Sequence, residues 1–228
     1  MQAYPFRRIR SFVRREGRIT QSQSLAFETL WPMYGLSKDA EGFLDLDKLF
    51  GRDSEKVLEI GFGDGQSLIQ MAKNAPEKDF IGIEVYRTGV GNLLREIEKE
   101  QISNIRLFHG DALEIVESKI PKDSIATIQV FFADPWPKTR HHKRRLVQAS
   151  FVELAAQKLK KGGRLHLATD WMDYAYHMMS VISAAGSFHN VAGEEAFLPR
   201  PNFRPLTKYE QRGLRLGHQT WDLLFERV

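Results

Sequence analysis

The chain has 228 residues, 42% of them hydrophobic, which is enough to bury one sizeable core. It carries 33 lysines and arginines against 29 aspartates and glutamates, so its net charge is only +4 and the placement of the charge matters more than the total. The absence of cysteine excludes disulfides, thiolate metal sites and a thiol nucleophile, and no apolar run is long enough to cross a bilayer. We therefore expect a cytoplasmic protein without a membrane segment.

The first twenty residues form a basic arm. They contain one acid, Glu16, and six arginines: Arg7, Arg8, Arg10, Arg14, Arg15 and Arg18. The arm lacks the apolar core of a secretory signal. Its composition fits solvated charge, an organellar transit peptide or contact with nucleic acid, and does not by itself choose among them.

A short helix is predicted after the arm, within residues 21–36, and we expect it to stop at Pro32 because proline interrupts a helix. Residues 37–47 are polar and indicate a connection. We therefore divide the chain into an arm with its connecting segment, residues 1–54, and a folded domain, residues 55–228.

Strand-like and helix-like stretches alternate through the folded domain. Strands are expected within residues 56–63, 79–85, 104–111, 124–134 and 164–170, and helices within residues 66–76, 88–101, 143–163 and 172–186. This alternation predicts a parallel sheet with right-handed crossovers and helices on both faces. Two last strands, within residues 188–192 and 220–228, have no crossover helix between them and predict an antiparallel pair at one edge. The expected fold is α/β with a mostly parallel, seven-stranded sheet.

An acidic residue stands at or near the carboxyl end of each of the five parallel strands: Glu59, Glu84, Asp111, Asp134 and Asp170. In an open α/β sheet, ligands bind beyond these strand ends. Each acid alone is also typical of a turn or a helix cap. Together the five indicate one acid-lined pocket.

The turn after Glu59 contains Gly61, Gly63 and Gly65, which is a weak motif on its own. It departs from the dinucleotide-binding pattern because Gln66 stands where that pattern needs glycine. Glu59 would repel a pyrophosphate but would suit a ligand that carries an ammonium and a sulfonium. Charge complementarity therefore favours S-adenosyl-L-methionine over NAD.

The segment "LEIGFGDG" resembles the first motif of class I S-adenosylmethionine-dependent methyltransferases, which implies a Rossmann-like fold. By this resemblance Glu59, with Gly61 and Gly63, holds the methionine end of the cofactor, Glu84 binds the ribose hydroxyls, and Asp111 lies near the adenine. A carboxylate can accept both hydrogen bonds of a vicinal diol.

The loop "ADPWPKTRHHKRR" places Asp134 before Pro135 and Trp136 before Pro137, so both residues are expected to be extended and the loop stiff. The alternative is a rigid turn with Trp136 as a core plug. No acid follows Asp134 in this basic stretch.

This loop is similar to the signature of the bacterial tRNA (guanine-N7-)-methyltransferases, as are "RRIRSFVRREGRIT", "LATDW" and "LTKYEQRG". The resemblance implies methylation of a guanosine at position 46 in the tRNA variable loop, with Asp134 in the active site beside the cofactor. It also implies a substrate site formed by Lys138, Asp170, Thr207, Lys208, Tyr209 and Glu210. The RNA contacts that it implies are Arg140, His141, His142, Lys143, Arg144 and Arg145.

The chemistry of this reaction limits the role of Asp134. Guanine N7 carries a free lone pair, so its methylation removes no proton and needs in-line approach to the methyl group. We expect Asp134 to orient the guanine and to stabilise the developing positive charge. Thr207 and Glu210 fit a capping box, and Glu210 would also suit the N1–H and N2–H of guanine.

Two other readings stay open. Asp-Pro-Trp-Pro imperfectly resembles the loops of methyltransferases that act on exocyclic amines of nucleobases, and a nucleic-acid-binding module without catalysis is a third possibility. We expect no metal, because no histidine or acid spacing matches a metal site. No feature of the sequence determines the oligomeric state, and we favour a monomer.

Overall fold

The computed structural model describes residues 10–12, 17–215, 217 and 219–228, and within the last helix it describes no side chain for residues 208, 209 and 212. Arg7, Arg8, Arg14 and Arg15 of the basic arm therefore lie outside the described residues. Within the described ranges, no helix has the length and apolarity that a membrane span requires.

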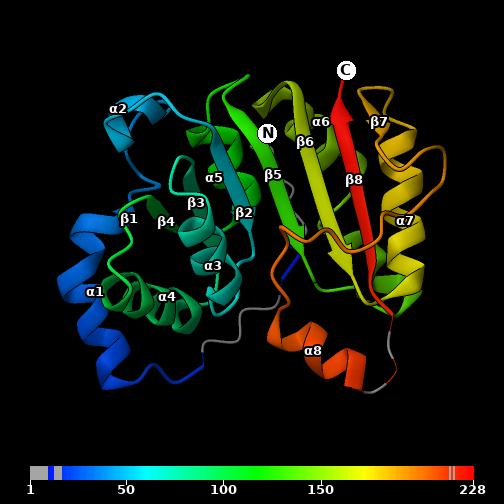
Figure 1. The fold of residues 1–228 in the computed structure, drawn as a ribbon. Helices are drawn as coiled ribbons and strands as arrows, with labels where there is room; N and C mark the ends of the chain where they lie inside the picture. Colours follow the sequence, from blue (N-terminus) through cyan, green and yellow to red (C-terminus); the bar gives the residue numbers. More distant parts are fainter. Residues whose placement is uncertain (1–9, 13–16, 216, 218) are drawn as a thin grey trace, which may run out of the picture.

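One twisted sheet, with strands in the order β1-β4-β3-β2-β5-β6-β8-β7, runs through the molecule and has helices on both faces (Figure 1). The strands are β1 (Gly35–Leu36), β2 (Lys56–Ile60), β3 (Asp79–Glu84), β4 (Ile105–His109), β5 (Ile125–Phe131), β6 (Leu159–Thr169), β7 (Phe188–Asn190) and β8 (Trp221–Arg227). The helices are α1 (Gln21–Tyr34), α2 (Leu46–Phe50), α3 (Gln66–Asn74), α4 (Arg87–Lys99), α5 (Ala112–Lys119), α6 (Ala149–Lys158), α7 (Met172–Ser183) and α8 (Lys208–Arg215), with a 3₁₀ helix η1 at Thr139–Arg144.

The pairing of the strands confirms the mostly parallel sheet. β1 to β6 pair in parallel, and β8 runs antiparallel to both β6 and β7. The predicted strand number of seven is corrected to eight, because the two residues of β1 pair with Leu107 and Phe108 of β4. So short a strand has no alternation from which it could be predicted.

Helix α1 continues through Pro32 to Tyr34, so the predicted stop at the proline is wrong. The proline stands in the last turn and removes only one late hydrogen bond, and the Gly35 N–H closes the end on the carbonyl of Trp31. Thr20 begins the helix with a capping box that includes Gln23.

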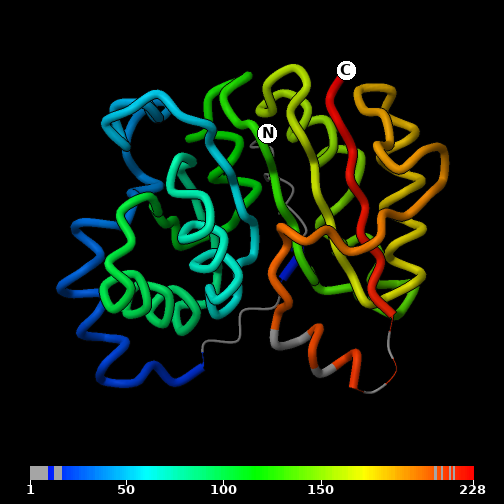
Figure 2. Tube along the Cα trace, in the orientation of Figure 1, coloured from blue at the N-terminus to red at the C-terminus, as the bar shows by residue number. Residues whose placement is uncertain are grey.

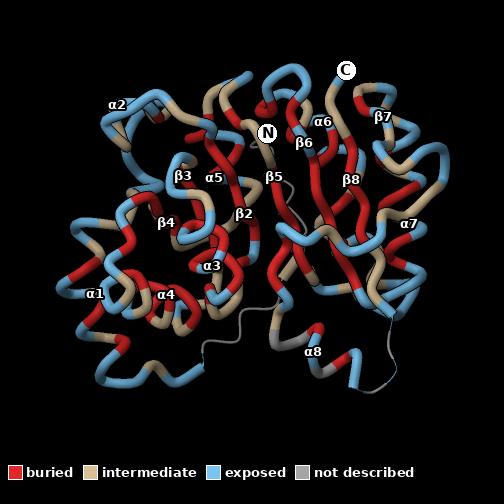
Figure 3. Tube along the Cα trace, in the orientation of Figure 1, coloured by how far each residue is buried: buried red, intermediate tan, exposed pale blue. Residues whose placement is uncertain are grey.

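Alternate residues of the strands face two apolar layers. Leu58 and Ile60 of β2 pack in the layer under α5, α6 and α7, whereas Val57 packs in the layer under α1, α3 and α4. The strands are correspondingly buried along most of their length (Figure 3). Glu59 lies between Leu58 and Ile60 and therefore faces the same side as Val57.

The predicted helix within residues 143–163 is in fact divided among three elements. The basic run forms η1, α6 spans only Ala149–Lys158, and residues 159–163 already belong to β6. Farther along, the segment that follows β7, orange in Figure 2, crosses the sheet near the carboxyl end of β6 before it enters α8.

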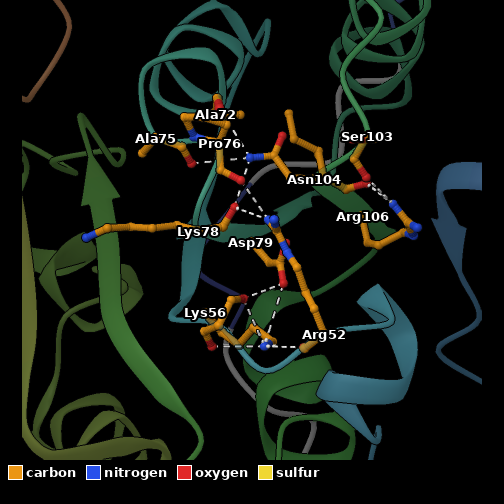
Figure 4. Close-up of polar contacts among 12 residues, drawn as sticks. Arg52, Lys56, Ala72, Ala75, Pro76, Lys78, Asp79, Ser103, Asn104 and Arg106 are labelled. Atoms are coloured by element: carbon orange, nitrogen blue, oxygen red, sulfur yellow. Dashed lines mark hydrogen bonds and ion pairs between the residues drawn. The ribbon is translucent and has the colours of Figure 1, made fainter.

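Polar contacts tie the amino ends of β2 and β3 together (Figure 4). The carboxylate of Asp79 is buried and accepts hydrogen bonds from Nε and Nη2 of Arg52 at 3.0 and 2.6 Å. The buried ammonium of Lys56 lies 3.6 Å from the same carboxylate and 2.8 Å from that of Asp47. Ion pairs therefore join the amino ends of these two strands.

Candidate functional site

A cavity of about 1000 Å³ lies at the carboxyl ends of the central strands. Four of the strand-end acids line it together: Glu59, Glu84, Asp134 and Asp170. The fifth, Asp111, caps α5 by accepting a hydrogen bond from the Leu113 N–H at 3.0 Å, and its own side chain is not among the described groups that line the cavity. The topology thus brings most of these acids to one place, as the strand-end argument expects.

The glycine turn after β2 is held by Glu84. Oε2 of this buried carboxylate accepts from the Gly63 N–H at 2.8 Å, and Oε1 accepts from the N–H groups of Val85 and Tyr86 at 2.6 and 3.0 Å. Burial raises the pKa of Glu84, the backbone hydrogen bonds act in the opposite direction, and Asp134 adds a further upward contribution. The turn is therefore fixed before any ligand binds.

Backbone conformation explains one glycine in this turn, and close packing explains another that contacts it. Gly63 has φ +60°, a conformation that glycine adopts without steric cost. A Cβ on Gly89 of α4 would lie 2.1 Å from the carbonyl oxygen of Gly63. Helix α4 thus supports the turn through backbone contact.

Glu59 is a buried acid with an unused acceptor. Its side chain is 2% exposed, and Oε2 has no hydrogen-bond partner among the described residues. Burial raises the pKa of Glu59 to about 8, and the neighbouring Glu84 contributes to the rise. Buried polar groups without a partner are rare in folded proteins, and a cationic ligand in the cavity would supply one. The site therefore fits a ligand that bears an ammonium group.

Sequence reasoning missed two polar neighbours of Glu59. Gln129 of β5 lies beside Glu59 in the sheet register, and His166 of β6 lies beside Gln129. Both are buried, and Oε1 of Gln129 and Nδ1 of His166 lack partners within the described part of the chain. The only sign of them in the sequence is that each is a polar residue within an otherwise apolar strand-like run.

The loop after β5 differs in part from the prediction. Asp134 is exposed at the cavity. Trp136 has φ +48° rather than the extended backbone that its proline neighbour favours. Its half-buried indole is held on several sides, since Nε1 donates to the carbonyl of Ser11 at 3.0 Å and the ring packs beside His141 and Arg144. These contacts outweigh the local preference, and the indole is not a core plug.

The basic residues of η1, together with Lys138 at its N-cap, fall into two groups by exposure. Lys138, Arg140 and Lys143 are exposed, Lys138 outside the cavity wall, and His141, His142 and Arg144 are half-buried.

Arg145 is only 3% exposed; its Nε donates to the carbonyl of Pro135 at 2.9 Å, and its Nη2 donates to the carboxylate of Asp173. Arg145 thereby lowers the pKa of Asp173. Its burial argues against the predicted RNA contact and assigns it to holding the loop.

The residues of the predicted substrate segment, 207–210, also differ in their surroundings. Thr207 lines the cavity, and its Oγ1 accepts from the Glu210 N–H at 3.1 Å, which is the capping bond predicted for this pair. The carboxylate of Glu210 is buried and accepts from Arg204 at both oxygens, each at 2.7 Å. This pairing argues against the predicted contact with guanine. The side chains of Lys208 and Tyr209 lie outside the described residues.

No group of three or more histidines or acids in the described part of the chain is arranged to hold a metal ion.

The fold is shared with known methyltransferases. A family model described as "Putative methyltransferase" matches residues 53–223. The solved structure of the 16S rRNA methyltransferase KamB superposes with a TM-score of 0.59 at 16% identity, covering 86% of this chain and 99% of that one. An antibiotic-related methyltransferase superposes with a TM-score of 0.55 at 20% identity, covering 85% and 94%. Fold and cavity together define a methyltransferase with a Rossmann-like sheet.

Sequence relatives narrow this class. The tRNA (guanine-N(7)-)-methyltransferase of Alcanivorax borkumensis is 57% identical over 97% of this chain and 92% of its own length. The enzyme of the same name from Aeromonas hydrophila is 55% identical over 97% and 93%. The chain belongs to the tRNA (guanine-N(7)-)-methyltransferase family.

Proposed function

We propose that this chain transfers a methyl group from S-adenosyl-L-methionine to N7 of a guanosine in tRNA, at position 46 of the variable loop. The observation that carries the proposal is the acid-lined cavity. In it, Oε2 of the buried Glu59 has no hydrogen-bond partner among the described residues, and the exposed Asp134 stands just beyond the end of the neighbouring strand β5. A cationic donor and an acceptor that becomes cationic both suit such a cavity.

The residues of the first two strand ends would hold the cofactor. Glu59 would accept from its ammonium, and this contact would favour the ionised carboxylate that burial alone disfavours. Three backbone N–H groups already use three of the about four lone pairs of the Glu84 carboxylate, and the one that remains, on Oε2, would accept from a ribose hydroxyl. Gly110 and Ala112 line the cavity on either side of Asp111, which supports an adenine site near α5.

When bound, the cofactor supplies an electrophilic methyl group. The protein needs no general base, because N7 gives up no proton as it gains the methyl group. Asp134 and Asp170 face the cavity from adjacent strands and would orient the guanine. Positive charge develops on the purine during transfer, and the fixed carboxylates would stabilise it.

The exposed cations of η1 would bind the RNA. Lys138, Arg140 and Lys143 follow Asp134 directly, so the phosphates that they neutralise would flank the base in the cavity. Single-stranded or looped RNA offers such a base without the cost of opening a duplex. The cytoplasmic location, the monomer and the division at residue 54 stay predictions, although α1 and β1 pack onto the folded domain.

The proposal is tested by incubating the purified protein with methyl-labelled cofactor and tRNA that lacks its own modifications. We expect label in N7-methylguanosine after digestion, and RNA sequencing should place it at position 46. An Asp134→Asn variant purified in the same way controls for contaminating activity. Label on an exocyclic amine would replace the proposal with the amine reading, and the absence of both cofactor binding and transfer would replace it with the binding module.

A further inference from the structure

Arg204 is the bulkiest fully buried side chain of those described, with an exposed fraction of 0%. Arginine is almost never buried unless it is paired. Here one guanidinium faces two carboxylates: Nη1 and Nη2 donate to Glu210 at 2.7 Å each, and Nε and Nη2 donate to Asp222 at 2.7 and 2.8 Å. Each pair is bidentate, which fixes orientation as well as distance.

The same cluster joins three elements of the fold. Asp222 belongs to β8 and lies 2.9 Å from Nε2 of His166 on β6, while Glu210 belongs to α8. We call Arg204, Glu210, Asp222 and His166 the Arg204 cluster. It fastens the segment between β7 and β8 to the sheet.

The cluster also lies directly behind the cavity. The guanidinium carbon of Arg204 is 5.7 and 5.6 Å from the ring centres of Phe131 and Phe132. Both phenylalanines line the cavity and lead into the loop of Asp134.

The backbone beyond Arg204 forms another part of the wall. Pro205, Leu206 and Thr207 line the cavity directly after Arg204. The segment is fastened on both sides of this wall, since the Leu198 N–H donates to the carbonyl of Asp222 at 2.9 Å and Thr207 caps Glu210. Arg204 thus stands at the point where the wall meets the sheet.

We propose that Arg204 is a positioning residue, which holds the wall at residues 205–207 and the Asp134 loop in register, and that Glu210 acts on the target guanine only through Arg204. The inference rests on the proposed function. It gives Glu210 a role that differs from direct contact with the base, because both of its oxygens are already paired in a buried site.

The first test is a double-mutant cycle with Arg204→Lys, Glu210→Gln and the two combined. Lysine keeps the charge but lacks the fork that binds two carboxylates at once. A displaced cavity wall would misalign the guanine with the methyl group and so slow the chemical step. We therefore expect kcat of each single variant to fall about tenfold or more per folded molecule. The Kd for the cofactor and the KM for tRNA should stay within about twofold, since their contacts lie elsewhere.

The result depends on whether the losses of kcat in the two single variants add in free energy in the double variant. If Glu210 acts through Arg204, the double variant is no slower than the slower single variant. Losses that multiply would show two independent roles and would overturn the inference. Glu194→Gln makes the same carboxyl-to-amide change at an exposed position of the same segment and should leave kcat unchanged. Unfolding temperatures recorded for every variant ensure that assays use folded protein.

The second test changes the base and needs only Glu210→Gln, so it applies even if Arg204→Lys does not fold. Hypoxanthine at the target position keeps N7 and lacks the 2-amino group of guanine. We expect the ratio of kcat/KM for guanine over hypoxanthine to be the same in the wild type and in Glu210→Gln. A ratio that collapses toward one in the variant would show direct contact with the base and overturn the inference.

The two proposals fail in different ways. If the wild-type protein methylates another atom, only the proposed function is overturned. The double-mutant cycle can then be measured on that product, and it still tests the role of Arg204.

Discussion

At the scale of single residues, Glu59 predicts how stability depends on pH. Its pKa is about 8 in the folded protein without ligand, whereas the ordinary value for a glutamate is 4.5. The folded state therefore holds a proton that the unfolded state has lost between these values, and stability falls as pH rises through this window. Glu59→Gln should remove this fall, which is on the order of 5 kcal/mol at most, and should weaken cofactor binding at least about tenfold.

Denaturant unfolding near pH 5 and near pH 8 measures the first effect, and calorimetry measures the second. Gln129→Met removes a neighbouring polar side chain, whose Oε1 has no partner among the described residues, without removing a titrating group. It should therefore keep the wild-type dependence on pH. An unchanged pH slope in Glu59→Gln would refute the assignment.

The roles of some residues can be predicted from the sequence, and those of others cannot. The acids at the strand ends were predictable, because the position of a strand end follows from the local pattern. The Arg204 cluster was not, since Asp222 is 18 residues from Arg204 and 56 residues from His166. Pairs so far apart in the chain leave no local signal, and only the fold brings them together.

At the scale of elements, the two ends of the central strands have separate tasks. The carboxyl ends form the cavity, and the amino ends of β2 and β3 are linked by the ion pairs of the buried Asp79 with Arg52 and Lys56 (Figure 4). Asp79→Asn leaves the ammonium of Lys56 buried with weaker compensation, so it should lower the free energy of unfolding by about 3 kcal/mol. Activity per folded molecule should not change, because the site lies at the other end of the sheet.

Urea unfolding and initial rates from the same preparation check this separation. Asp47→Asn is the matched control, because Asp47 also pairs with Lys56 but its side chain is 62% exposed. Exposed ion pairs contribute little, so its cost should stay below about 1 kcal/mol. A loss of turnover in well-folded Asp79→Asn would show that the two ends are coupled.

The regular elements were predictable where periodicity was strong, and less so where tertiary contacts decide. The alternation of strands and helices gave the parallel sheet, since it depends on local pattern. The two residues of β1, the turn of α1 beyond Pro32 and the break between η1 and α6 each depend on packing or on a single hydrogen bond. Left-handed backbone at Trp136 has the same origin, because its indole contacts fix it.

At the scale of the whole molecule, the strand-end acids of the cavity and the exposed cations of η1 surround one opening, while Lys73 and Lys99 of the cavity wall are paired with Glu100. Acids line the cavity, and the exposed cations of η1 stand beside it. Binding of tRNA should therefore weaken steeply with salt, because phosphate contacts release counterions. Arg140→Ala combined with Lys143→Ala should reduce the slope of log affinity against log salt by about 1.4 to 1.8, at about 0.7 to 0.9 per phosphate contact, and leave cofactor affinity unchanged.

Filter binding of tRNA across a salt series measures this slope. Lys160→Ala combined with Lys161→Ala removes two exposed cations at the opposite end of the sheet, where Leu159 pairs with the first residue of β5, so the slope should keep its wild-type value. The comparison separates local phosphate contact from net charge, because both double variants lose the same charge. Equal slopes in the two double variants would show that the salt dependence comes from net charge. A wild-type affinity that does not change with salt would refute the phosphate contacts altogether.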